Sequence, residues 1–248
     1  MILTFATLLL HVTLAADPEA PGIAGDIAFF RIDYPTAVSM YESALEQDPV
    51  NAGLLWRLAR VYVCMGEVAD RAERSGMFRT AEEYARRCIM LDSTKAEGHT
   101  WLAGALGYMA LEAGKSEQLR LSFELVREVR IALKLNPRDD AAYSILGSFY
   151  RALGNVSWLE RQLARLFFGG IPEGGFAEAE AALQNAITLG PDIMRHHYEL
   201  AVLYVDWGRK EEAITVLEHA ARLPVRVAID RQRIKRIGEL LSAYNLAP

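Results

Sequence analysis

The sequence predicts an all-α fold in which antiparallel helix pairs stack into a right-handed superhelix. Three observations support this prediction. A pattern of small and apolar residues recurs along the 248-residue chain at helical spacing, and glycine or proline stands between its copies. Hydrophobic residues make up 52% of the chain, which is enough for a continuous core along such a stack and too many for a disordered protein.

The clearest copy of the pattern lies at 197–224. Its residues are, in order, Leu200, Ala201, Tyr204, Gly208, Ala213, Leu217, Ala220 and Pro224. This order and spacing match the tetratricopeptide repeat, in which W-x2-L-G-x2-Y on a first helix precedes A-x3-F and Pro on a second. The three alanines let the two helices approach closely, and Gly208 is expected to end the first helix. The same spacing recurs upstream, so the match is not a single coincidence.

The copies divide residues 26–248 into one helical domain of stacked repeats. Complete repeats are predicted at about 51–93, 94–137, 138–191 and 192–225. A truncated capping repeat is expected at 26–50 and a capping helix at 227–245, because the terminal units of a solenoid cover its open ends. Asp139 and Asp140 are expected to cap the helix that follows them.

The links within the repeats are longer than the pattern requires. Nine positions separate Tyr204 from Ala213 in the last repeat. The corresponding separation is nineteen in the first two complete repeats and twenty-nine in the third, between Tyr150 and Ala179. We therefore expect lengthened helices in the first two, including a second helix over 67–91. In the third we expect an extra helix at 155–168, followed by a glycine-rich hinge at 169–175.

The inserts resemble a known family. The segments HTWLAGALG (99–107), ALKLNPRD (132–139) and ILGSFYRALGNVSWLERQLARLFFGGIP (145–172) are similar to the regulator-of-microtubule-dynamics family of tetratricopeptide-like proteins, and the chain resembles a bacterial-type member. The family's W-x2-R-x2-A-x-L-F insert is matched by Trp158, Arg161, Ala164, Leu166 and Phe167. The resemblance covers about 54–244. It implies a helical adaptor fold without a catalytic site.

Charge and motif content exclude several classes of function. The formal net charge of −5 argues against a nucleic-acid partner. Two cysteines are too few for a disulfide scaffold. His196 and His197 point about 100° apart on a helix, which is poor geometry for chelating one metal ion. The sequence therefore predicts no enzyme, no cofactor and no metal site.

The first sixteen residues, MILTFATLLLHVTLAA, read as a signal peptide with cleavage after Ala15 or Ala16. The apolar run is shorter than a membrane span. Residues 17–25 are then expected to be a linker. We therefore expect an exported, periplasmic protein. The alternative is a cytoplasmic protein whose amino-terminal segment is buried.

The concave face of the stack is the predicted binding surface. Its inward positions, read from the first helices of the repeats, are Trp56, Arg60, Thr100, Gly104, Tyr108, Ser144, Ser148, Arg151, Tyr198 and Val202. Small and apolar residues leave room there for an occupant. The predicted function is a non-catalytic scaffold for a protein or peptide partner in the cell envelope. The alternative is a carrier of a lipid or another apolar ligand.

Two further segments bear on that surface. The insert helix carries an apolar stripe that includes Trp158, Leu163, Leu166 and Phe167. It is expected either to roof the groove, leaving Arg60 or Arg151 for an anionic head group, or to extend the core on the convex side. The last helix carries a basic cluster of Arg231, Arg233, Lys235 and Arg236, which is expected to be a solvated cap or to touch an anionic partner.

Overall fold

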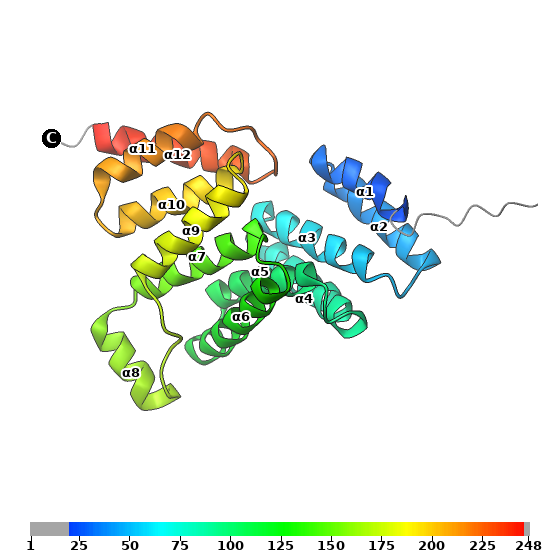
Figure 1. The fold of residues 1–248 in the computed structure, drawn as a ribbon, viewed down its shortest axis with the longest axis horizontal. Coiled ribbons are helices and arrows are strands. Elements are labelled where there is room, and N and C mark those ends of the chain that lie inside the picture. Colours follow the sequence, from blue (N-terminus) through cyan, green and yellow to red (C-terminus); the bar gives the residue numbers. More distant parts are fainter. Residues whose placement is uncertain (1–19, 246–248) are drawn as a thin grey trace, which may run out of the picture.

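A computed structural model describes residues 20–245, which form twelve α-helices and no β-strand (Figure 1). The first six are α1 (Ala20–Phe30), α2 (Tyr34–Gln47), α3 (Ala52–Val68), α4 (Arg71–Leu91), α5 (Ala96–Glu112) and α6 (Lys115–Leu135). The last six are α7 (Asp140–Gly154), α8 (Trp158–Phe168), α9 (Phe176–Leu189), α10 (Met194–Asp206), α11 (Lys210–Ala220) and α12 (Asp230–Asn245). The predicted all-α repeat solenoid is confirmed.

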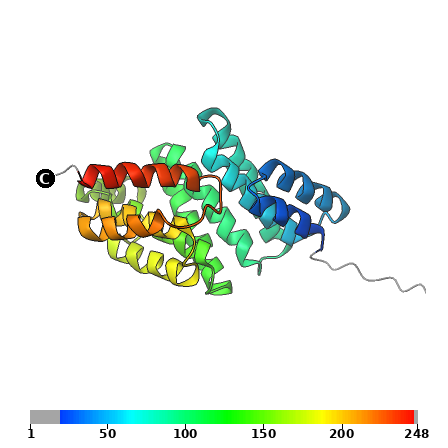
Figure 2. The ribbon, with the colours of Figure 1, turned by 90° about the horizontal axis from the view of Figure 1, so that it is seen from above.

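The helices pack in the predicted pairs. α3 packs along α4, α5 along α6, α7 along α9 and α10 along α11, while successive first helices α3, α5, α7 and α10 also touch in order. α1 and α2 form the amino-terminal cap, and α12 covers α10 and α11 at the other end (Figure 2). Each repeat therefore buries one face against the next, as a solenoid requires.

Local sequence signals account for the helix ends. Asn51 and Asp139 accept hydrogen bonds from the backbone N–H groups of Leu54 and Ala142, at 3.1 and 2.9 Å, which satisfies donors that the helix itself cannot. The predicted cap at Asp139 is confirmed. Gly208 adopts a φ of 77° just after α10, the left-handed conformation that ends a helix most readily with glycine. The expected stop is confirmed.

The long links take two forms in the structure. α4 and α6 are lengthened to 21 residues each, whereas the third repeat inserts the separate helix α8. The expected second helix over 67–91 is wrong at its start, because α3 continues to Val68 and leaves Glu67 in the first helix. α1 begins at Ala20, inside the segment expected to be a linker. The predicted signal peptide at 1–16 lies outside the described residues.

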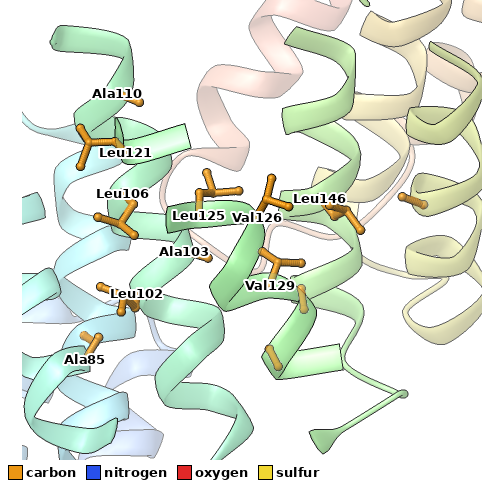
Figure 3. Close-up of a cluster of buried hydrophobic side chains, with 14 residues drawn as sticks. Ala85, Leu102, Ala103, Leu106, Ala110, Leu121, Leu125, Val126, Val129 and Leu146 are labelled. Carbon is orange, nitrogen blue, oxygen red and sulfur yellow. The ribbon is translucent and has the colours of Figure 1, made fainter. Parts of the chain in front are cut away.

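The central core is centred on α5 and α6 of the second repeat, reaches into the repeats on both sides, and combines leucine with small residues (Figure 3). Leu102, Leu106, Leu125 and Val129 interlock across α5 and α6, and each is at most 3% exposed. Alanine and glycine set the separation of the helices. A Cβ atom added at Gly147 would lie 2.5 Å from Cγ of Leu183, so α7 and α9 approach as closely as glycine allows. The core thus depends on size complementarity at each repeat contact.

A buried histidine joins α5 to α6. Nδ1 of His99 lies 2.6 Å from a carboxylate oxygen of Glu128, and its Nε2 lies 3.1 Å from the carbonyl oxygen of Ser93. Both partners can accept, so this site suits the protonated ring, which donates from both nitrogens. Burial opposes that charge, but the hydrogen bonds from the ring to Glu128 and Ser93 raise the pKa of His99 above its ordinary value.

The two ends of the superhelix are joined across its interior. The segment between α11 and α12 reaches α2, where the backbone N–H of Ala228 donates to the hydroxyl of Tyr34 at 3.0 Å. Val227 and Ala228 also pack against the amino-terminal core. This contact brings α12 over the inner face of the stack. Among the helices described, none has an apolar stretch long enough to cross a bilayer.

Candidate binding cavity on the inner face

A cavity of about 590 Å³ opens between the first helices of the repeats and α12. Its lining comes from α3, α5, α10, α12 and the residue before α12. The lining residues are Glu67, Tyr108, Tyr198, Glu199, Ile229, Gln232, Arg233, Lys235, Arg236 and Glu239. Three are acidic and three are basic, and Ile229 is the one aliphatic side chain among them. The cavity therefore offers donors and acceptors of both charges.

Glu67 holds the floor of the cavity together. One of its carboxylate oxygens accepts from the Tyr108 hydroxyl on α5, contacts the guanidinium of Arg195 on α10, and lies 3.3 Å from Nη2 of Arg233 on α12. Nη1 of Arg233 lies 2.8 Å from Asp230. The side chains of Glu67 and Arg233 are only 2% and 8% exposed. Two guanidinium groups thus face two carboxylates in a buried, balanced cluster that ties four helices together.

The two phenols of the cavity remain neutral hydrogen-bonding groups. Burial raises the pKa of Tyr108, and the nearby Glu67 carboxylate raises it further. Burial, followed by the charge of Glu199, raises the pKa of Tyr198. Neither hydroxyl therefore ionises near neutral pH, and both can take part in hydrogen bonds at the cavity surface.

The outer rim of the cavity is accessible. Gln232, Lys235 and Arg236 on α12 are exposed, and Nη1 of Arg236 lies 2.9 Å from Glu239 one turn along the same helix. On α10, Glu199 lies 3.7 Å from Arg151, which is too long for a hydrogen bond. The rim thus presents charged groups held by weak surface pairs, and these can exchange for groups of a partner.

The family follows from a match along most of the chain. Residues 30–245 match the model of the family described as regulator of microtubule dynamics protein 1-3. The chain belongs to this family. One relative is regulator of microtubule dynamics protein 3 of Xenopus laevis, which is 29% identical over 76% of this chain and 41% of its own length. Another is protein 2 of Mus musculus, which is 26% identical over 76% of this chain and 47% of its own length. Protein 1 of Bos taurus is 23% identical over 79% and 62%.

The chain spans about half the length of the curated relatives it matches. Solved structures support the fold. A thermophilic tetratricopeptide protein of Thermus thermophilus superposes with a TM-score of 0.67 at 22% identity, over 91% of this chain and 100% of that one. Yeast Tom70 superposes with a TM-score of 0.54 at 17% identity, over 93% of this chain and 41% of the Tom70 chain. These likenesses concern the fold alone.

Of the residues predicted on the concave face, Tyr108 and Tyr198 line the cavity. Thr100 and Ser144 are instead buried between helices, each 1% exposed, and Thr100 donates to Asp139 at 2.6 Å. The remaining small or apolar positions of the set also lie outside the cavity lining: Gly104 is buried beside Ile145, Ser148 donates to a backbone carbonyl of its own helix, and Val202 is half-buried. The first helices thus use most of these positions for packing.

The predicted arginines are already paired. Nη2 of Arg60 lies 2.9 Å from Asp26, and its guanidinium lies 3.8 Å from the ring centroid of Phe29 and 5.0 Å from that of Trp56. Nη1 of Arg151 lies 2.8 Å from Asp206. Neither guanidinium is therefore a free cation for an anionic head group, and Trp56 belongs to the amino-terminal aromatic cluster rather than to the cavity.

The insert helix does not roof the inner face. No residue of α8 is buried, and α8 stands at the outer edge of the molecule beside the end of α7 (Figure 1). Trp158, Leu163, Leu166 and Phe167 are 45–74% exposed. Both expectations for this stripe are wrong, because α8 neither closes the groove nor adds to the core on the convex side.

Sequence reasoning missed the acidic floor and misread the last helix. Arg233 was expected in a solvated cap with Arg231, Lys235 and Arg236, but it turns inward and is 7% exposed, whereas the other three are exposed. Glu67 gave a signal that could have been used, because it is a lone acid within the apolar run MGEV of α3. A charged residue at such a position needs a buried partner.

The two adjacent histidines of α10 have separate partners. His196 contacts Asp140 at 2.8 Å through Nε2, and His197 contacts the carbonyl oxygen of Pro191 at 2.8 Å through Nε2. Within residues 20–245, no group of three His, Cys, Asp or Glu side chains is placed to hold a metal ion. Both cysteines are free thiols buried in the core.

Proposed function

We propose that this protein is a non-catalytic scaffold that binds a polypeptide segment of a partner protein in the inner cavity. The observation that carries the proposal is the lining, with three acidic side chains, three basic side chains, two phenols and an amide around about 590 Å³. A polypeptide presents backbone donors and acceptors together with charged side chains, so it can satisfy such a mixed surface. Membership of a tetratricopeptide-like family supports the same class of function.

The same lining weighs against an apolar ligand in this cavity. A pocket for an acyl chain is lined mainly by hydrophobic side chains with a few polar groups at one end. Here an acyl chain would meet six charged side chains and a single aliphatic one, Ile229. Burying those charges against hydrocarbon is costly unless each keeps its partner. The polypeptide is therefore the preferred occupant.

The test compares two double variants that carry the same change of charge. Lys235→Glu/Arg236→Glu reverses two cations of the cavity rim, whereas Arg231→Glu/Lys210→Glu reverses two cations outside it. Proteins recovered from the native extract with wild type are identified by mass spectrometry, and purified candidates are titrated by calorimetry. We expect one partner to bind wild type and the control but to bind the rim variant at least roughly tenfold more weakly. A partner that binds all three equally refutes the cavity as the site.

We further propose that the scaffold works in the cell envelope after export. The support is the apolar run 1–16 and the small residues Ala15 and Ala16 that end it. Amino-terminal sequencing of the native protein is expected to begin at Ala16 or Asp17. An intact Met1 on protein from the cytoplasmic fraction refutes export without affecting the proposed cavity.

A further inference from the structure

The insert helix α8 exposes an apolar face that no other part of the described chain covers. Trp158, Leu159, Leu163, Leu166 and Phe167 fall on one half of the helix and are 72%, 60%, 45%, 74% and 68% exposed. None of the eleven residues of α8 is buried. An apolar face of this kind on a projecting helix marks a contact surface, because solvent exposure of so many large side chains is unfavourable.

The orientation of this face is set by the structure. Arg161, on the opposite half of α8, donates to the backbone carbonyl of Leu153 at the end of α7 and lies within 3.4 Å of the carbonyl oxygens of Val156 and Gly174. Ser157 and Glu160 form a reciprocal capping box at the start of the helix, and Gly169 ends it with a φ of 79°. The polar half is thus fastened to the body, and the apolar half points outward.

Four exposed cations lie on α8 or close to the segments at its two ends. Arg165 lies on α8 itself. Lys115, at the start of α6, interacts electrostatically with Glu160. Arg130 and Lys134 line a second groove with Ile171 and Pro172, which lie in the loop after α8. All four cations are exposed, and none takes part in an ion pair within residues 20–245. Glu173 is the one acid that lines this second groove, and Glu160 is held in the capping box. Glu117 and Glu124 on α6 pair with Arg120.

We propose that α8 docks the protein onto the surface of a bilayer that contains anionic phospholipid. Trp, Leu and Phe on one face with arginine beside them are the composition of a helix that lies in the plane of a membrane interface. The surrounding cations complement anionic head groups and add attraction that decreases with salt. Docking of this kind needs no membrane-spanning segment, because α8 would enter only the boundary between head groups and acyl chains.

A second copy of the chain fits this face less well. An eleven-residue helix is about 16 Å long and about 10 Å wide. One side of it therefore offers only part of the roughly 800 Å² that each partner contributes to a standard interface. Two copies meeting through α8 would also bring Arg165 of each copy into the same contact. A bilayer surface has no such size requirement and favours the cations.

The experiment measures flotation of the full-length protein with vesicles of phosphatidylcholine alone or with added phosphatidylserine. The test variant is Leu166→Asp/Phe167→Asp, and the matched control is Met90→Asp/Val50→Asp. The control residues are 77% and 70% exposed, close to the 74% and 68% of the test residues, and the change of charge is identical. All proteins keep the apolar run 1–16, so only differences between variants report on α8.

We expect wild type and the control to float with phosphatidylserine vesicles, and salt to weaken this binding. The α8 variant is expected to lower the partition coefficient at least roughly tenfold while its circular dichroism and thermal unfolding match the control. The proposal is overturned if wild type does not float, or if the α8 variant floats as well as wild type. It is also overturned if wild type is a dimer without vesicles and the α8 variant is a monomer, since the face would then join copies of the chain.

Discussion

The contacts of Glu67 predict that this one carboxylate on α3 makes a large contribution to the stability of the fold. Glu67→Gln keeps the size of the side chain but removes the charge that faces Arg195 and Arg233. Arg233 would then keep only the carboxylate of Asp230, and the partly buried Arg195 would lose its ion pair with Glu67. Removing one member of a buried ion pair typically costs 3–5 kcal/mol, because it leaves an uncompensated charge. Because glutamine can still accept a hydrogen bond from Tyr108, we expect a cost near the lower end, about 3 kcal/mol.

This cost is large enough to measure by two methods. For a chain of this size, 1 kcal/mol corresponds to about 2–4 °C in Tm, so Glu67→Gln is expected to lower Tm by about 6–12 °C. Hydrogen exchange is expected to show α10 and α12 opening before α3 and α5, since the cluster is one of the few contacts across the interior. The urea midpoint should fall in parallel.

Controls separate the buried cluster from general effects of charge removal. Glu117→Gln breaks an exposed pair with Arg120 and is expected to unfold close to wild type, because surface pairs contribute little. In a double-mutant cycle, Arg233→Gln should cost less in the Glu67→Gln background than in wild type, with a coupling energy of about 1–3 kcal/mol. If Glu67→Gln has the same Tm as Glu117→Gln, the interior cluster does not stabilise the fold and the reasoning is refuted.

Three further predictions concern α5, α7 and α8. The raised pKa of His99 means that its pairing with Glu128 stabilises the fold fully below the unfolded value of about 6.5 and less as pH rises through the folded value. The urea midpoint of wild type should therefore fall more steeply above about pH 6.5 than that of His99→Gln, and equal slopes would contradict the assignment. Gly147→Leu should destabilise by about 1–3 kcal/mol or more through its clash with Leu183, whereas a Tm equal to wild type would show that α7 and α9 are not in this register. Arg161→Ala should speed hydrogen exchange in α8 with Tm near wild type, and unchanged exchange would mean that other contacts hold the helix.

Most of the helix pairs could be predicted from sequence because their signals are local. Small residues such as Ala201 and Gly147 mark where two adjacent helices touch, and both are buried there. Caps such as Asp139 mark where a helix begins. These features depend on neighbours within one repeat, and helical periodicity reports them directly. The extra length in three repeats and the existence of α8 followed from counting residues between copies of the pattern.

The candidate site could be predicted only in part. Tyr108 and Tyr198 were expected on the inner face and line the cavity. Thr100 and Ser144 were predicted there by the same repeat spacing but are buried between helices. The spacing of the repeat pattern places a residue on one side of its own helix. It does not say how closely the next repeat approaches. The repeats around Thr100 pack tightly enough to bury it, whereas α3 and α10 are far enough apart to leave a cavity.

Sequence by itself determined most of the helices and which helices are partners, because each of these decisions rests on contacts within about forty residues. It misplaced the start of α4 and missed the start of α1. Only the tertiary structure decided that Glu67 meets Arg195 and Arg233, across separations of 128 and 166 residues. Those meetings result from small rotations added over successive repeats, and no local pattern encodes their sum. The outward face of α8 was also decided only by the folded structure, although its cause is local: Arg161 binds carbonyl groups of the chain on both sides of the helix. The physical reason is that a helix's periodicity reveals its apolar side, while the surroundings of that side are set by all the other helices together.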